Sequence, residues 1–200
     1  MSNSLIFNSV GFLIFFPAVA ALYFIIRHKY RWILLLISSY YFYMSWKPEY
    51  IILIAVSTLV SYISAINISN SKAKKKIFFL CLSIFTNIGL LFAFKYLNFF
   101  SNSVRELFKT FSIPFSPITL KILLPVGLSF YTFQALGYTI DVYNGKIKPE
   151  KHLGIFALFI SYFPQLVAGP IERAKNFIPQ FHQKQYFDYK RATDGLKLML

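Results

Sequence analysis

Residues 51–68 read IILIAVSTLVSYISAINI, and residues 77–94 read IFFLCLSIFTNIGLLFAF. Neither stretch contains a charged residue. A helix needs about 20 mainly apolar residues to cross the hydrocarbon core of a bilayer. The two stretches therefore predict two neighbouring helices that span a membrane.

Four further charge-free runs surround this pair, at residues 5–26, 32–46, 122–140 and 153–169. The first is long enough to span a bilayer with some tilt, whereas the second is short. The predicted fold class is an all-α integral membrane protein of about five to six hydrophobic helices.

Composition argues against a soluble protein. The chain is 56% hydrophobic and only 14% charged, whereas soluble domains are about 25% charged. The net charge of +14 does not indicate nucleic-acid binding, because the basic residues stand in short clusters between apolar runs. Such clusters are typical of anchors beside anionic lipid, so we expect a lipid bilayer as partner and no nucleic acid. The single cysteine, Cys81, predicts neither a disulfide nor a metal site.

The basic clusters also predict an orientation. Residues 27–31, 72–76 and 146–151 carry them and follow the first, third and fifth runs, whereas the loop around Lys47 is neutral. Because basic loops stay in the cytoplasm, the N-terminus is predicted to lie outside. Residues 95–121 are then an external loop.

The sixth run does not fit this alternation. If residues 153–169 span the bilayer, a basic tail from Glu172 to Lys197 is external. Pro164 and Gly169-Pro170 allow the alternative that the segment dips in and returns to the same side. Broken backbone at membrane depth requires protein groups or a water-filled cavity as partners. We therefore expect a cavity near residues 160–173, with Gln165 and Arg173 as candidate lining residues.

A polar stripe lies within the fifth run. Gly127, Tyr131, Gln134, Tyr138 and Asp141 recur at spacings of four and three, which places them on one helix face. Such a face must contact protein or water, since lipid satisfies none of its polar groups. Two interpretations stay open: hydrogen bonds between helices, or the lining of an internal channel.

A nucleophilic triad is not predicted. Gly127-Leu-Ser129-Phe-Tyr131 begins like a nucleophile elbow, but Tyr131 occupies the position of the second glycine. The three histidines, His28, His152 and His182, stand in or beside basic loops, away from Ser129. None of them is a convincing catalytic base.

Five motifs occur in order along the chain: LIFNS at 5–9, FKYLNF at 94–99, LPVGLSFYTFQ at 124–134, YTIDVYNG at 138–145 and FPQLVAGPI at 163–171. Together they resemble the bacterial membrane-bound O-acyltransferases, in particular the branch that contains the alginate O-acetyltransferase. The D-alanyl transferase of teichoic acid synthesis is a more distant relative. The resemblance covers essentially all 200 residues.

The resemblance implies a function. Enzymes of this family pass an acyl group, here expected to be acetyl, to hydroxyls of an exported polysaccharide or cell-envelope glycan. The donor is an acyl-CoA or an acyl-carrier partner that acts as co-substrate, and no bound cofactor is expected. Periplasmic or extracellular acetylation proteins are implied as partners. The implied location is the bacterial cytoplasmic membrane, crossed several times.

The resemblance also implies that residues 1–200 are the N-terminal part of one larger helical channel domain. The catalytic histidine of the family is expected beyond Leu200, so this chain alone is predicted to be inactive. Tyr131, Gln134, Tyr138, Asp141, Gln165 and Arg173 are then candidate channel-lining or substrate-binding residues. The alternative is a small polytopic transporter or substrate-binding membrane subunit. The apolar pattern that rises from Tyr189 to Leu200 favours a longer chain.

Overall fold

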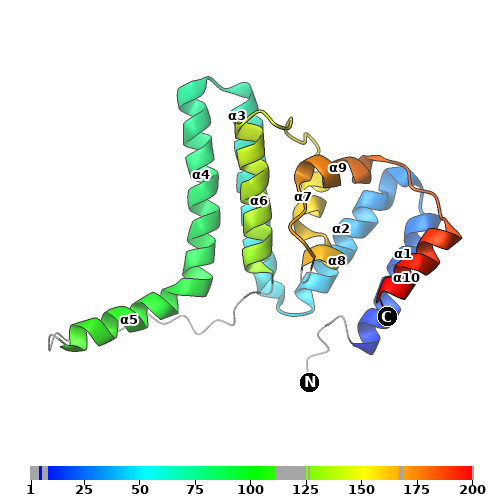
Figure 1. Ribbon diagram of the computed structural model, residues 1–200, viewed down its shortest axis with the longest axis horizontal. Helices are drawn as coiled ribbons and strands as arrows, with labels where there is room; N and C mark the ends of the chain where they lie inside the picture. Colours follow the sequence, from blue (N-terminus) through cyan, green and yellow to red (C-terminus); the bar gives the residue numbers. More distant parts are fainter. Residues whose placement is uncertain (1–4, 6–8, 111–124, 126, 167–168, 200) are drawn as a thin grey trace.

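The computed structural model describes residues 5, 9–110, 125, 127–166 and 169–199 (Figure 1). These residues form helices and connecting segments, without any strand. The elements are α1 (Val10–Ile25), α2 (His28–Met44), η1 (Pro48–Tyr50), α3 (Ile51–Asn70), α4 (Ala73–Leu91), η2 (Phe92–Tyr96), α5 (Leu97–Thr110), α6 (Leu128–Tyr143), α7 (Leu153–Ser161), α8 (Phe163–Leu166), α9 (Ala174–His182) and α10 (Tyr189–Met199). The all-helical prediction is confirmed, and each of the six apolar runs carries helix.

Two helical stretches, Pro48–Asn70 and Ala73–Thr110, are long and apolar enough to cross a membrane. Two other apolar helices, Val10–Ile25 and Leu153–Leu166, are shorter. The second stretch combines α4, η2 and α5. The two neighbouring helices predicted from residues 51–68 and 77–94 are therefore part of the longest apolar elements among the described residues.

The core of the bundle is formed by α3, α4 and α6, which run side by side (Figure 1). A chain of polar side chains joins them inside this apolar contact. Ser57 of α3 donates to the Asn87 amide oxygen at 2.5 Å, and the Asn87 amide nitrogen donates to Ser61 at 3.0 Å. Ser83 then pairs with Thr139 of α6 at 3.1 Å. Small residues let the helices approach closely, and the hydroxyls supply the interhelical bonds.

A second layer consists of α1, α2, α7 and α8. Phe12, Phe42 and Phe163 are buried together where α1, α2 and α8 meet. Helix α7 packs on α2 through Gly154, where a Cβ atom would lie 2.2 Å from the Trp32 ring. Glycine is thus required at this contact because the indole occupies the space.

One expectation for the chain after α4 is wrong. Residues 95–121 were predicted as a loop, but the helix continues through η2 and α5 to Thr110. Helix α5 leaves α4 at a sharp bend and extends away from the bundle (Figure 1). The π-helical turn η2 stands at the bend, and such turns are a recognised cause of helix kinks. Residues 111–121 lie outside the described part of the chain.

Candidate functional site

The polar stripe lies on α6 and faces the protein, as its spacing predicts. Tyr131 is fully buried, and Gln134, Tyr138 and Asp141 are at most 8% exposed. The stripe runs along the side of α6 that contacts α7 and the segment after it. Its neighbour in space is therefore the unusual sequence around Pro164.

That sequence forms a hairpin, hereafter the α7 hairpin (residues 150–166 and 169–173). It begins beside the last turns of α6, where the Glu150 backbone N–H donates to the Tyr138 hydroxyl at 2.8 Å. The Tyr62 hydroxyl of α3 donates to the carbonyl of Lys151 at the same end. Helix α7 then descends along the bundle, with the His152 ring capping its first turn through the Ile155 N–H.

The tip of the α7 hairpin reaches the opposite end of α6. Helix α7 ends at Ser161, and the Phe163 N–H donates to the Ser39 hydroxyl of α2 at 3.2 Å. The Leu166 carbonyl oxygen would lie 2.7 Å from a Cβ atom on Gly127, the residue that precedes α6. Gly127 has a φ of 73°, which also favours glycine.

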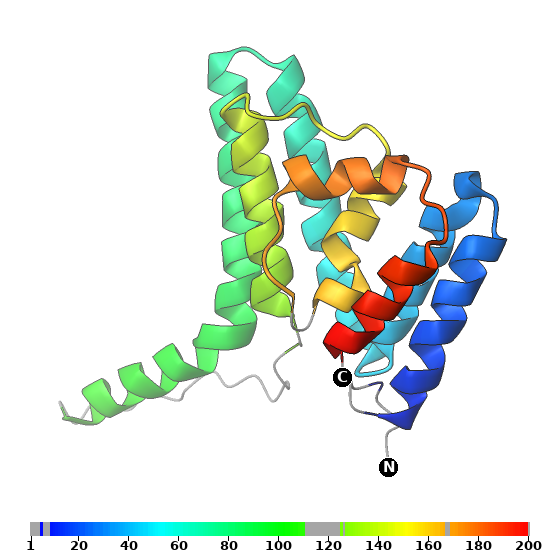
Figure 2. The same ribbon diagram turned by 45° about the vertical axis from the view of Figure 1, so that its right-hand side comes forward.

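The return limb, residues 169–173, runs back along α6 to α9 (Figure 2). The Gln165 amide donates to the Pro170 carbonyl at 2.5 Å, and the Gly169 N–H donates to the Gln165 carbonyl at 2.9 Å. Arg173 then stands 3.6 Å from Asp141, in the last turn of α6. The segment thus enters and leaves at the same end of α6, and protein groups bond the Phe163 and Gly169 N–H groups and the Pro170 carbonyl.

A cleft of about 370 Å³ lies between α6 and the return limb. It is lined by Phe133, Gln134, Gly137, Tyr138, Ile140, Asp141, Lys146, Ile171, Glu172, Arg173 and Ala174. Four of the six predicted site residues, Gln134, Tyr138, Asp141 and Arg173, therefore share one cavity. It includes part of the region where a cavity was expected.

The charges at the mouth of the cleft are arranged by the end of α6. Gly145, with a φ of 71°, donates to the Val142 carbonyl, and the Lys146 N–H donates to the Asp141 carbonyl. This pair of bonds is a Schellman motif, which folds the chain back over the last turn. The Lys146 ammonium consequently lies 3.8 Å from Asp141, on whose carboxylate Arg173 also converges. Two exposed cations thus stand beside the buried Asp141 carboxylate at one end of the cleft.

Two predicted site residues lie elsewhere. The Tyr131 ring packs edge-on against that of Tyr43, with ring centroids 6.5 Å apart, in the core beside α2. Gln165 is buried within the α7 hairpin and bonds its own return limb. In this structure both residues stabilise packing and do not line the cleft.

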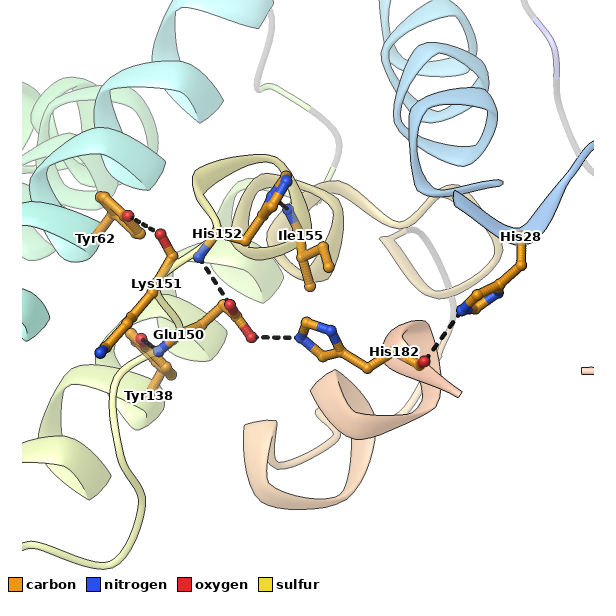
Figure 3. A network of polar contacts seen from close by, with 8 residues as sticks. All are labelled: His28, Tyr62, Tyr138, Glu150, Lys151, His152, Ile155 and His182. Carbon is orange, nitrogen blue, oxygen red and sulfur yellow. Dashed lines mark hydrogen bonds and ion pairs between the residues drawn. The ribbon is translucent and has the colours of Figure 1, made fainter. Parts of the chain in front are cut away.

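The histidines join three segments at the end of the bundle that carries the cleft mouth (Figure 3). The His182 ring lies 2.8 Å from the Glu150 carboxylate, and the ring of His28 bonds the His182 carbonyl at 3.1 Å. The second Glu150 oxygen accepts the His152 N–H at 2.8 Å. This network attaches α9 to α2 and to the start of the α7 hairpin. No cluster of metal-ligating side chains occurs in the described ranges.

Sequence reasoning missed Lys146 and Glu172 as cleft residues, and Glu150 as the centre of the histidine network. The basic cluster predicted Lys146 only as a lipid anchor. The Asn144-Gly145 turn just before it was the available signal, because a helix that ends in glycine directs the next residue back over its last turn.

Fold and site together define a class: an apolar helical bundle in which a returning hairpin and one helix line a cleft that carries charged residues. Comparison with known proteins is more specific. The chain is 36% identical over 98% of its length to a probable alginate O-acetylase of Pseudomonas aeruginosa. It is 30% identical over 96% of its length to a peptidoglycan O-acetyltransferase of Helicobacter pylori. A teichoic acid D-alanyltransferase of Lacticaseibacillus rhamnosus matches 34% of the chain at 30% identity.

These matches confirm the resemblance to the membrane-bound O-acyltransferases. Although nearly the whole chain aligns with these two relatives, it spans only about two fifths of their length. It covers 38% of the Pseudomonas protein and 42% of the Helicobacter protein. No family model and no solved structure matches the chain.

Proposed function

We propose that this chain is part of a membrane-embedded O-acyltransferase that transfers an acetyl group to hydroxyls of an exported polysaccharide or cell-envelope glycan. The observation that carries this proposal is the similarity, over 98% of the chain, to a protein named alginate O-acetylase. A peptidoglycan O-acetyltransferase matches nearly as much of the chain, so the acceptor is assigned only as a glycan. These relatives are all named for acyl or aminoacyl transfer, and no observation favours a transporter.

The membrane assignment is supported by the arrangement of charge. The three basic clusters stand at one end of the bundle, where the turn between α3 and α4 and the loop between α6 and α7 lie together (Figure 1). Lys47 and Glu49 belong to the opposite end. By the positive-inside rule, the basic end lies in the cytoplasm and the N-terminus outside. The α7 hairpin then enters the bilayer from the cytoplasm and returns to it.

This orientation assigns the cleft to the donor. Its mouth lies at the basic end, between Lys146 and Arg173. A cytoplasmic acyl donor, either an acyl-CoA or an acylated carrier protein, presents phosphate next to its thioester arm. Exposed cations bind phosphate by charge-assisted hydrogen bonds, while Gln134 and Tyr138 lie deeper on the same wall.

The general base is assigned to a part of the enzyme other than the three histidines of this chain. His152 caps α7, His182 pairs with Glu150, and His28 bonds a backbone carbonyl. None of these rings lines the cleft. A general base must come within hydrogen-bond reach of the acceptor hydroxyl, and the cleft offers no histidine for that role. We therefore expect the chain alone to be inactive.

The test is acetyl transfer from a labelled donor to glycan by membranes that contain the full-length enzyme. Arg173→Ala should lower kcat/KM for the donor by about tenfold, as expected for one charge-assisted contact of about 1.5 kcal/mol. Lys175→Ala is the matched control, because Lys175 is an exposed cation of α9 that does not line the cleft. Equal effects of the two substitutions would contradict the donor site, and absence of any transfer by the parent enzyme would contradict the function.

A further inference from the structure

Helix α5 (Leu97–Thr110) is unlike the other long helices because its two faces differ in polarity. Its apolar residues Leu97, Phe100, Val104, Leu107 and Phe108 follow spacings of three, four, three and one, which places them on one face. Its opposite face carries Asn102, Arg105, Glu106 and Lys109. The remaining apolar residue, Phe99, lies on this opposite side, so α5 has one continuous apolar face and one mainly polar face.

Two residues of the apolar face of α5 are exposed, whereas Leu97, Val104 and Phe108 are half-buried. Phe100 is 48% exposed and Leu107 is 59% exposed. Among the described residues, the main helix contact of α5 is with η2, the turn from which it grows. The exposed side chains of α4, including Phe85 and Ile88, continue the same apolar surface around the bend.

The direction of this face follows from one aromatic contact. The Phe100 ring packs against that of Phe92, with centroids 5.2 Å apart. Phe92 is the first residue of η2, directly after the last residue of α4. The apolar side of α5 is therefore turned back toward the span, and its polar side is turned away from it.

A contact with α6 shows where the bend lies along the axis of the bundle. The Lys95 ammonium lies 3.4 Å from the Ser129 hydroxyl, in the first turn of α6. That turn stands at the end of the bundle opposite the basic loops. From Ala73 to Tyr96 the helical chain is about 36 Å long at 1.5 Å per residue, enough to cross the hydrocarbon core before the bend.

From these observations we infer that α5 is an interfacial helix that lies on the leaflet opposite the basic loops, with its apolar face in the bilayer. Its occupant is the lipid surface itself: acyl chains contact Phe100 and Leu107, and head groups contact Arg105 and Lys109. Amphipathic helices of this kind bury their apolar face about 5–10 Å into the boundary between head groups and acyl chains. The inference rests on the proposed membrane insertion and adds a lipid-binding surface to it.

The experiment uses full-length protein in phosphatidylcholine–phosphatidylglycerol vesicles, with single cysteines carrying an environment-sensitive fluorophore. Cys81→Ser is included in the background. Leu107→Cys reports the apolar face, Asn102→Cys is its matched control on the polar face, and Phe85→Cys reports the middle of α4. Lipids with a nitroxide near the head group or near the chain end act as shallow and deep quenchers, and iodide quenches from water.

We expect the probe at residue 107 to be quenched about twofold more by the shallow than by the deep nitroxide, given the burial depth of interfacial helices. The probe at residue 102 should respond to iodide, and the probe at residue 85 to the deep nitroxide. If residue 85 responds as expected while residue 107 is quenched by iodide or by none of the three, α5 lies in water or beneath protein and the inference is overturned. If residue 85 is not reached by the deep nitroxide, membrane insertion fails and the inference fails with it.

Discussion

Gly127 holds the tip of the α7 hairpin against the start of α6. Its φ of 73° is unfavourable for any residue with a Cβ atom, and that atom would meet the Leu166 carbonyl oxygen at 2.7 Å. We expect Gly127→Ala to lower the free energy of unfolding by about 1–3 kcal/mol, because strain and the clash act together. Denaturant unfolding of the purified protein in detergent, followed by circular dichroism, measures this change.

Gly137 provides the control on the same helix. A Cβ atom added to Gly137 would meet no neighbouring side chain or segment within 4 Å, and its backbone angles are ordinary for a helix. Gly137→Ala should leave stability unchanged or raise it by up to about 1 kcal/mol, the gain in helix propensity. Equal losses for both substitutions would show that the contact with Leu166 is not what holds the hairpin.

Gln134 fits both interpretations of the polar stripe, as a hydrogen bond between helices and as part of a channel lining. Its amide donates to the Phe159 carbonyl of α7 at 2.9 Å, which joins the helices, and its side chain also lines the cleft. Gln134→Leu should cost about 0.6 kcal/mol, the average for such bonds within membranes, and should also lower acetyl transfer per folded molecule. Specific activity of the full-length enzyme, normalised to folded protein, separates the two effects.

Thr132→Val is the matched control for that experiment. Thr132 is buried on α6, bonds only backbone carbonyls of its own helix, and does not line the cleft. It should retain full specific activity. If the Gln134→Leu enzyme is as active per folded molecule as the Thr132→Val enzyme, Gln134 only joins helices and has no role in acetyl transfer.

At the scale of helices, the polar chain between α3 and α4 makes a testable contribution to their association. Asn87→Leu removes the partner of both Ser57 and Ser61 inside the contact. Because the two buried hydroxyls then lack the Asn87 side chain as hydrogen-bond partner, the free energy of unfolding should fall by about 1–3 kcal/mol.

Asn67→Leu is the matched change, because Asn67 bonds only the Ile63 carbonyl of its own helix. It should have little effect on the midpoint of thermal unfolding in detergent. If Asn87→Leu also leaves that midpoint unchanged, apolar packing alone joins α3 and α4.

The helices themselves could largely be predicted from the sequence, because charge-free runs and their breaks are local features. The common face of Tyr131, Gln134, Tyr138 and Asp141 was predictable for the same reason, since spacing along one helix fixes it. Helix α5 was missed because its apolar residues are interspersed with polar and charged ones, so no long apolar run marks it. Its amphipathic spacing was the signal that could have revealed it.

The cleft could be predicted only in part. Its two walls, α6 and the return limb, each carry an unusual local pattern, and both patterns were recognised. The pairing of Asp141 with Arg173 depends on how deep the α7 hairpin reaches before it turns, which is decided by packing at Ser39 and Gly127. The separation of Tyr131 and Gln165 from the cleft is likewise set by tertiary packing, which a residue pattern does not contain.

For the whole molecule, one geometric relation links fold, orientation and site: the α7 hairpin begins and ends at the same end of the bundle as the basic loops. Glu150 and Arg173 both contact the last turns of α6, and His182 returns to Glu150. This relation resolves the charge conflict in the sequence, because the basic segment after the hairpin need not cross to the outside. It also places Asp141, Lys146 and Arg173 of the cleft at the end of the bundle that the proposed orientation assigns to the cytoplasm.

The most direct test of this relation is cysteine accessibility in spheroplasts that express the full-length enzyme without its other cysteines. Single cysteines replace Lys47, Lys74, Lys148 and Lys175, and an impermeant thiol reagent is added before or after permeabilisation. Position 47 should react in intact spheroplasts, whereas positions 74, 148 and 175 should react only after permeabilisation. Reaction of position 175 from outside while position 148 stays protected would show that residues 153–169 span the bilayer, and would contradict the account.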